Sequence, residues 1–185
     1  MKTKIAGVLL LMISVMWAEQ IYMDTKISMR LGAGSVLSRE TRIEVKAFGD
    51  MYLGAVHSVW DGLGLTGVLD TFHAGIYAAY PVKLPGAEAT LFVGLSYNSS
   101  LLVAGSIGAD YGIRANITSI PFSPAICIFG QSFSDSTSLD IFMGPSFSLG
   151  NISLDIGYAP NLIVLHETFA LTYTSSVAGR VVLKF

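Results

Sequence analysis

The chain has 185 residues, of which 52% are hydrophobic and only 13% are charged, and its formal net charge is −2. One domain accommodates this length. The shortage of charged residues, compared with roughly 25% in typical soluble domains, points to a solvent other than water. No block of basic residues is present, which argues against nucleic acid as a partner. The single cysteine, Cys127, excludes an internal disulfide.

The N-terminal segment has the order of a secretory signal peptide. Lys2 and Lys4 precede an apolar run from Ile5 to Trp17, and the small residue Ala18 follows. A run of about 13 apolar residues is too short for a membrane-spanning helix, which needs roughly 20. We therefore expect a signal peptide over residues 1–18, cleaved after Ala18, and one mature domain over residues 19–185.

Beyond the signal segment, apolar and polar residues alternate with a period of two. Alternation of this kind predicts β-strands with one apolar and one polar face. The polar positions carry half of the charged residues of the mature chain, namely Lys26, Arg30, Arg42, Glu44, Lys46, Asp110, Arg114, Asp140, Asp155, Arg180 and Lys184. The opposite face of the same segments is almost purely apolar. A soluble β-sandwich or lipocalin-like barrel would also alternate, but it would need a far more charged exterior.

Spanning helices do not fit the sequence. The longest uncharged stretches are residues 89–109 and 115–134, and they are interrupted by Asn98-Ser99-Ser100 and by Pro121 and Pro124. Only helices and closed barrels pair all their backbone amides inside a membrane. The alternation therefore predicts a membrane β-barrel with apolar residues facing lipid and charged residues facing the lumen.

The number of strands follows from the turn-like segments, which are Ser38–Glu40, Leu84–Glu88, Asn98–Ser100, Ser134–Thr137 and Gly150–Asn151. They predict ten strands, at residues 25–37, 41–57, 71–82, 89–97, 101–117, 125–133, 138–148, 152–159, 163–173 and 176–185. An even number is expected because both chain ends of such barrels lie in the periplasm. Chain length alone favours eight strands, so eight remains an alternative.

The last segment places Val177, Val181, Leu183 and Phe185 on one face, with Arg180 and Lys184 on the other. This ending resembles the C-terminal β-signal of bacterial outer-membrane β-barrel proteins, in which a terminal aromatic residue is recognised by the barrel-assembly machinery. Leu183 departs from the pattern, because many members carry an aromatic residue there.

The resemblance implies an all-β fold, a closed antiparallel up-and-down barrel of 8 to 10 strands, integral to the outer membrane of a Gram-negative cell. Membrane lipids, lipopolysaccharide and the assembly machinery would be its partners. Whether such barrels associate as homo-oligomers stays open.

Two functions are compatible with this barrel. Its connections are too short for a receptor surface, which favours a structural or passive envelope role with a lumen plugged by charge pairs, such as Arg114 with Asp110. The alternative is a narrow pore for small, preferably anionic solutes, because the lumen positions hold seven basic residues against four acidic ones.

A lipid-acting or proteolytic enzyme is the weakest interpretation. The histidines are His57 beside Ser58, His73, and His166 beside Glu167. Adjacent residues on a strand point to opposite faces, so the two adjacent pairs are poor catalytic pairs. Three scattered histidines do not form a metal site. We therefore expect no enzyme, no metal and no cofactor.

Overall fold

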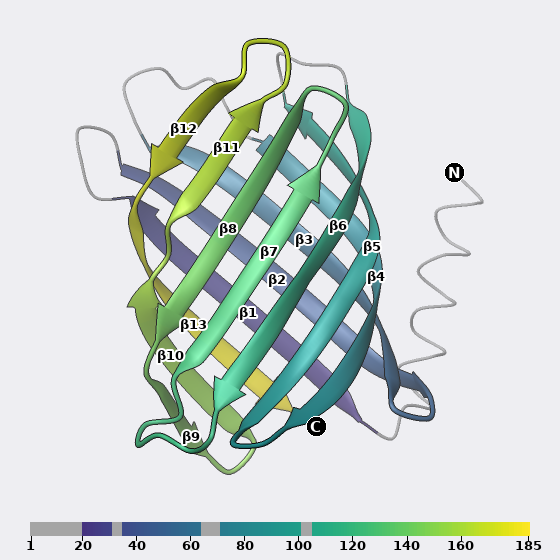
Figure 1. Ribbon diagram of the computed structural model, residues 1–185, viewed down its shortest axis with the longest axis vertical. Coiled ribbons are helices and arrows are strands. Elements are labelled where there is room, and N and C mark those ends of the chain that lie inside the picture. The colour runs from purple at the N-terminus through teal and green to yellow at the C-terminus, as the bar shows by residue number, and fades with distance from the viewer. Residues whose placement is uncertain (1–19, 31–34, 64–70, 101–104) are drawn as a thin grey trace.

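The computed structural model describes residues 20–30, 35–63, 71–100 and 105–185, so the predicted signal peptide lies outside the described residues. The described residues form strands and connections (Figure 1). The strands are β1 (Ile21–Arg30), β2 (Ser35–Phe48), β3 (Met51–Leu63), β4 (Thr71–Leu84), β5 (Ala87–Ser100), β6 (Ser106–Ile117), β7 (Ala125–Ser132), β8 (Ser136–Gly144), β9 (Ser146–Leu149), β10 (Ile152–Tyr158), β11 (Asn161–Leu165), β12 (Ala170–Thr174) and β13 (Ser176–Lys184). None of the described segments is a helix with the length and hydropathy to cross a membrane.

Three of the barrel staves are each divided into two labelled strands. β8 continues into β9, β10 into β11, and β12 into β13. The pairing passes through these breaks without a shift, because Leu149 pairs with Ile152, Met143 with Tyr158, and Ser136 with Leu165 in one register. Prolines explain two of the breaks, since Pro145 and Pro160 have no N–H to donate to the ladder. The barrel therefore has ten staves.

The barrel closes where β1 pairs with β13. Their ladder runs from the pair Tyr22 and Lys184 to the pair Arg30 and Ser176. It is extended by two backbone bonds, from the Ile21 N–H to the Phe185 oxygen at 3.0 Å and from the Phe185 N–H to the Ile21 oxygen at 2.8 Å. All pairings are antiparallel and follow chain order around the barrel (Figure 1). The predicted closed up-and-down barrel is confirmed.

The number ten is confirmed, but two errors in the predicted boundaries cancel. The tight turn at Gly49 and Asp50, where Gly49 has φ +56°, separates β2 from β3, and the predicted strand 41–57 ran through it. Towards the C-terminus, the predicted strands 152–159, 163–173 and 176–185 correspond to two staves, over residues 152–165 and 170–184.

Two predicted turns are also wrong. Ser38–Glu40 lies inside β2, and Asn98–Ser100 lies at the end of β5. The cause is physical, because the inner face of a membrane barrel is polar and its Ser, Asn and Glu residues resemble turn residues. The remaining predicted turns are present, with Gly86 and Gly150 at positive φ.

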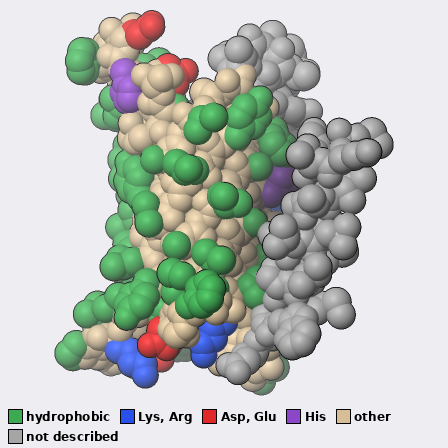
Figure 2. Space-filling model, turned by 90° about the vertical axis from the view of Figure 1, so that its right-hand side faces the viewer, with side chains coloured by type: hydrophobic (Ala, Val, Ile, Leu, Met, Phe, Trp, Pro, Cys, Tyr) green, Lys and Arg blue, Asp and Glu red, His purple; other side chains and the backbone are tan. Residues whose placement is uncertain are grey.

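The outer wall is apolar. Its exposed side chains include Ile27, Leu53, Ile76, Leu91, Val93, Leu95, Ile107, Leu154 and Ile156. Figure 2 shows hydrophobic side chains over the wall, with Lys, Arg, Asp and Glu gathered at its ends. Exposed aromatic residues lie near the strand ends, including Phe48, Tyr80 and Phe185 at the end that holds the C-terminus and Phe72, Tyr97 and Tyr173 towards the other. Aromatic belts of this kind are typical of membrane interfaces.

This wall generates a depth-dependent prediction. Val93 is 64% exposed and lies in the middle of β5. Ile107 is 76% exposed and is the second residue of β6. The predicted strand 101–117 had placed Ile107 in mid-strand. Val93→Arg should lower the free energy of unfolding by roughly 2–4 kcal/mol, and the control Ile107→Arg by about 0–1 kcal/mol, because the cost of a lipid-facing charge falls towards the interface. Denaturant titration of the protein folded in lipid bilayers measures both. Equal costs would contradict the placement.

Candidate functional site

Charged side chains gather in the lumen rather than at its rim. Those that are buried are Asp24, Lys26, Arg42, Glu44, Asp110, Asp155 and Arg180. The side chains of Glu40, Arg114 and Asp140 are 13%, 14% and 17% exposed. We call these ten residues the lumen network. Burying charges is costly unless they are paired and hydrogen-bonded, so the pairing decides whether the lumen is stable.

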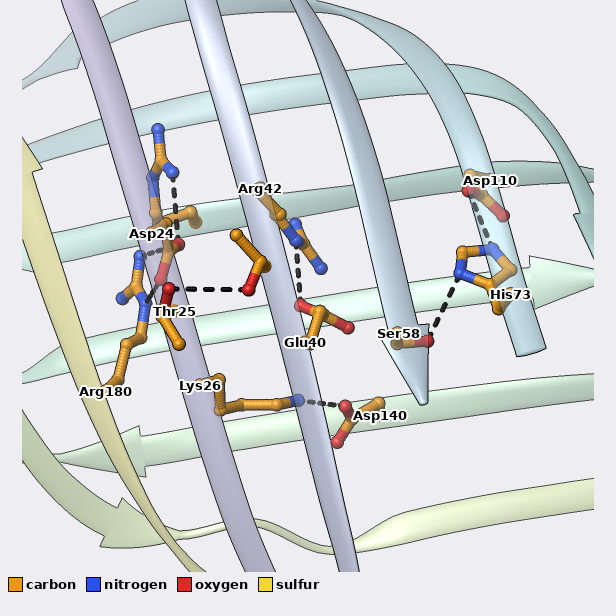
Figure 3. A network of polar contacts seen from close by, with 12 residues as sticks. Asp24, Thr25, Lys26, Glu40, Arg42, Ser58, His73, Asp110, Asp140 and Arg180 are labelled. Atoms are coloured by element: carbon orange, nitrogen blue, oxygen red, sulfur yellow. Dashed lines mark hydrogen bonds and ion pairs between the residues drawn. The ribbon is translucent and has the colours of Figure 1, made fainter. Parts of the chain in front are cut away.

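Arg180 anchors one side of the network. Its Nε and Nη2 donate to the two carboxylate oxygens of Asp24, at 2.8 and 2.7 Å, and its Nη1 donates to Asp155 at 3.0 Å. A bidentate bond between a guanidinium and a carboxylate is the strongest form of such a contact. Arg180 lies on β13, Asp24 on β1 and Asp155 on β10, so these bonds join three neighbouring staves. Figure 3 shows the contact between Arg180 and Asp24.

Arg114 reaches across the lumen. Its guanidinium donates to the two oxygens of Glu44, at 3.0 and 3.3 Å, and approaches Asp24 at 3.5 Å. Arg114 lies on β6, whereas Glu44 lies on β2 and Asp24 on β1, which are not its neighbours in the sheet. The Tyr77 hydroxyl also donates to Glu44, at 3.0 Å. These bonds tie opposite walls of the barrel together.

A third group of charged residues lies next to these bonds in the lumen. Lys26 on β1 pairs with Asp140 on β8, and the Arg42 Nε donates to Glu40 at 2.8 Å (Figure 3). The Arg42 guanidinium also lies 4.2 Å from the ring centre of Phe129 and 4.9 Å from that of Phe92. Contacts between cations and aromatic faces are favourable when both are desolvated.

Aromatic rings fill the space around the charges. Tyr77, Phe92 and Phe129 are all buried and pack in one cluster with Tyr52 and Val56. The ring of Tyr77 lies directly over Gly54 on the neighbouring strand, where any side chain would overlap it. Gly54 is therefore required for this packing, because only glycine leaves the space.

The structure places the eleven charges expected in the lumen in three ways. Eight take part in lumen ion pairs: Lys26, Arg42, Glu44, Asp110, Arg114, Asp140, Asp155 and Arg180. Lys46 and Lys184 lie near the strand ends at the end of the barrel that holds the C-terminus, and within the described residues neither belongs to an ion pair. The side chain of Arg30 lies outside what the structure describes.

Sequence reasoning missed Asp24 and Glu40. Each lies two positions before a residue that was identified, Lys26 and Arg42, so the alternation itself could have found them. Asp24 was lost because the first strand was predicted to start at residue 25, and Glu40 because it was assigned to a turn. With them, the lumen network holds four Lys or Arg residues and six carboxylates, so the excess of basic charge expected from the sequence is absent from it.

The network leaves a cavity at the end of the barrel that holds the C-terminus. Its volume is about 230 Å³, and Arg114, Asp155 and Arg180 contribute to its lining. Nearer the rim, Tyr22 and Tyr52 meet edge to face with ring centres 5.3 Å apart. The cavity thus borders the charges of the lumen network at this end of the barrel.

The histidines occupy three different environments. His57 is exposed on the outer wall against Phe72, and His166 bonds Thr137 and the Ser134 carbonyl near the tip of the barrel. The adjacent pairs His57–Ser58 and His166–Glu167 are thus not brought together in the lumen. His73 is 2% exposed in the lumen, where its Nδ1 lies 3.4 Å from the Ser58 Oγ and its Nε2 lies 3.2 Å from an Asp110 oxygen.

Sequence reasoning missed the contact between Ser58 and His73 because it considered only residues adjacent in the chain. Ser58 and His73 are direct partners across β3 and β4. The 14 residues of chain between their positions hid the pair. Within the described residues, His, Cys, Asp and Glu side chains form no cluster of three or more that could hold a metal ion.

Comparisons with known proteins give distant likenesses. No protein-family model and no curated protein matches the sequence. In structure the chain is similar to Neisserial surface protein A, with 14% identity, a TM-score of 0.42, and coverage of 90% of this chain and 96% of that chain. It is also similar to a major outer membrane protein from Thermus thermophilus, with 12% identity, a TM-score of 0.31, and coverage of 89% and 99%. The chain is a closed β-barrel that resembles bacterial outer-membrane proteins. Its function has to be inferred from its own wall and lumen.

The partners of Arg114 give a testable prediction. Arg114→Leu should lower the free energy of unfolding by about 3 kcal/mol, because Glu44 loses its cation and stays buried. Adding Glu44→Gln should restore part of that loss, whereas adding Asp110→Asn should not, because Asp110 contacts His73 rather than Arg114 as the sequence suggested. Urea titration of the single and double variants in detergent measures the coupling. Rescue by Asp110→Asn instead would contradict the described pairing.

Proposed function

We propose that the protein is an integral outer-membrane β-barrel with a structural or passive role in the cell envelope and a lumen closed by its charge network. The observation that carries this proposal is the set of bonds from Arg114 across the lumen to Glu44 and Asp24. Barrels of this strand number are narrow enough for side chains to fill. The apolar wall supports residence in a bilayer, since a water-exposed surface of that composition would aggregate.

The same network bears on the alternative of a narrow anion-selective pore. An anion-selective pore uses rings of basic side chains. Here Arg42, Arg114 and Arg180 are each paired with carboxylates, and the network holds more carboxylates than Lys and Arg residues. The lumen therefore favours closure over anion passage.

Single-channel recording in a planar bilayer tests the closed lumen. The unmodified barrel should show no steps of conductance, whereas the double variant Arg114→Ser, Glu44→Ser should show them, because it removes the bonds across the lumen. The matched control is Lys83→Ser, Glu88→Ser, a directly paired couple at the strand ends of β4 and β5, which should stay silent. Steady anion-selective steps from the unmodified barrel would replace the proposal with the pore.

Biogenesis of this barrel would use the barrel-assembly machinery, with lipid and lipopolysaccharide as its surroundings. The side chain of Phe185 is 67% exposed, and its backbone alone makes the bonds to Ile21. The Phe185 ring thus adds little to the folded barrel and is available for recognition.

Phe185→Asp should lower the amount of heat-modifiable, folded barrel in the outer membrane severalfold without lowering export across the inner membrane. Phe48→Asp is the matched control, because Phe48 is an aromatic residue that is 75% exposed near the same end of the barrel. Gel mobility of unheated membrane fractions measures the folded amount. Equal amounts from the Phe185 variant and the unmodified protein would contradict recognition of the C-terminal residue.

A further inference from the structure

One carboxylate of the lumen network differs from the others in its partner. Asp24, Glu40, Glu44, Asp140 and Asp155 each pair with arginine or lysine. Asp110, which is fully buried, has His73 as its only ion-pair partner among the described residues. Elsewhere in this lumen, each buried carboxylate is neutralised by a side chain that is always positively charged. The choice of imidazole here calls for a separate explanation.

The imidazole of His73 lies between a hydroxyl and this carboxylate. Its Nδ1 is 3.4 Å from the Ser58 Oγ, and its Nε2 is 3.2 Å from the Asp110 Oδ2 (Figure 3). The three side chains come from β3, β4 and β6 and are 5%, 2% and 0% exposed. A hydroxyl, an imidazole and a carboxylate in this order form the constellation that activates serine as a nucleophile, and it is recognised by geometry rather than by sequence order.

The surrounding residues hold Asp110 in place. The Ser96 Oγ donates to the Asp110 Oδ1 at 2.6 Å, so one carboxylate oxygen is fixed and the other is turned towards His73. Asp110 reaches β4 over Gly75, where a Cβ atom would lie 2.8 Å from its Oδ2. A larger residue at position 75 would push Asp110 away from the imidazole. The packing thus serves the contact between Asp110 and His73.

The position of the ring proton follows from this carboxylate. The Asp110 Oδ2 lies 3.2 Å from Nε2 without a hydrogen bond to it, so it is the carboxylate charge that favours a proton on Nε2, which leaves the lone pair on Nδ1, towards Ser58. The amide nitrogen of Gln131 lies 2.8 Å from Nε2. A proton on Nε2 therefore requires the flipped amide, in which the Gln131 oxygen accepts that proton, and the two amide orientations are interchangeable. His73 is then a base directed at the serine hydroxyl.

We propose that Ser58, His73 and Asp110 form an acyl-transfer site in the lumen, with Ser58 as nucleophile, His73 as general base and Asp110 as the positioning residue. The Ser58 oxygen attacks the carbonyl of a carboxylic ester while its proton moves to the His73 Nδ1. The C–O bond to the alcohol breaks, the alcohol takes that proton, and the acyl group stays on Ser58. Water, deprotonated by the same nitrogen, then attacks the acyl carbonyl. The bond between the acyl carbon and the Ser58 oxygen breaks, that oxygen takes the proton back from His73, and the carboxylic acid leaves.

The location of the site limits its substrates. Ser58 and His73 lie towards the ends of β3 and β4 that are remote from the C-terminus, so they face the cell exterior if the proposed membrane topology holds. The ring of Phe129 meets His73 edge to face at 6.3 Å between ring centres. Because the three side chains are buried and Phe129 lies beside His73, we expect an ester with a short acyl chain rather than a long-chain lipid.

A fluorophosphonate tests the nucleophile directly. The purified, folded barrel is treated with diisopropyl fluorophosphate, and peptide mass spectrometry locates the adduct. We expect modification at Ser58, with His73→Gln lowering its rate about 100-fold or more, in the range of general-base catalysis. p-Nitrophenyl acetate should give a burst of p-nitrophenolate that Ser58→Ala abolishes.

Ser28→Ala is the matched control, because Ser28 is a buried lumen serine bonded to Ser38 with no imidazole near it in the described contacts. It should leave labelling and the burst unchanged, and unheated gel mobility verifies that each variant is folded. A folded wild-type barrel that carries no adduct at Ser58 overturns the proposal, as does labelling that is unaffected by His73→Gln. Neither result depends on the membrane topology or on conductance, so the proposed envelope role is tested separately.

Discussion

The structure depends on one requirement, that no backbone amide in an apolar environment is left unpaired. A sheet of this size has two edges, and each edge would expose a row of N–H and C=O groups. The ladder between β1 and β13 removes both edges at once. Closure also divides the side chains into two sets, because neighbouring residues on a strand point to opposite faces. One set faces outwards and is apolar, and the other faces the lumen and carries the lumen network.

The interior then has to solve its own polar problem. Carboxylates enclosed by a barrel wall are tolerated only with partners, and Asp24 obtains two arginines from β13 and β6. Asp24 is shared between a neighbouring and an opposite wall, which makes the network cooperative. The loss of any member leaves its partners buried without a compensating charge. The aromatic cluster of Tyr77, Phe92 and Phe129 fills the space between the charges. The lumen thus contains paired charges with aromatic side chains packed between them.

Much of the fold could be predicted from the sequence, because the period of two and the near absence of charge on one face determine both the strands and their environment. The limits of the prediction have definite causes. Polar lumen residues such as Ser38 and Asn98 have the composition of turns, while the Gly49–Asp50 turn is too short to stand out. The partners of Arg114 and His73 were also out of reach, since contacts across the lumen depend on how the barrel closes and leave no local pattern. Contacts between paired strands, such as Ser58 with His73, become visible only when the register is known.

The seam between β1 and β13 also affects the order of events during folding. It joins the first described strand to the last, so loop closure over almost the entire chain has to occur before its hydrogen bonds form. Folding that proceeds from the N-terminal strand as the chain is synthesised cannot close the barrel, because β13 is made last. Until β13 has formed, β1 stays unpaired on one side and its backbone edge is open to aggregation. The last event in forming the barrel is therefore the meeting of its first and last described strands.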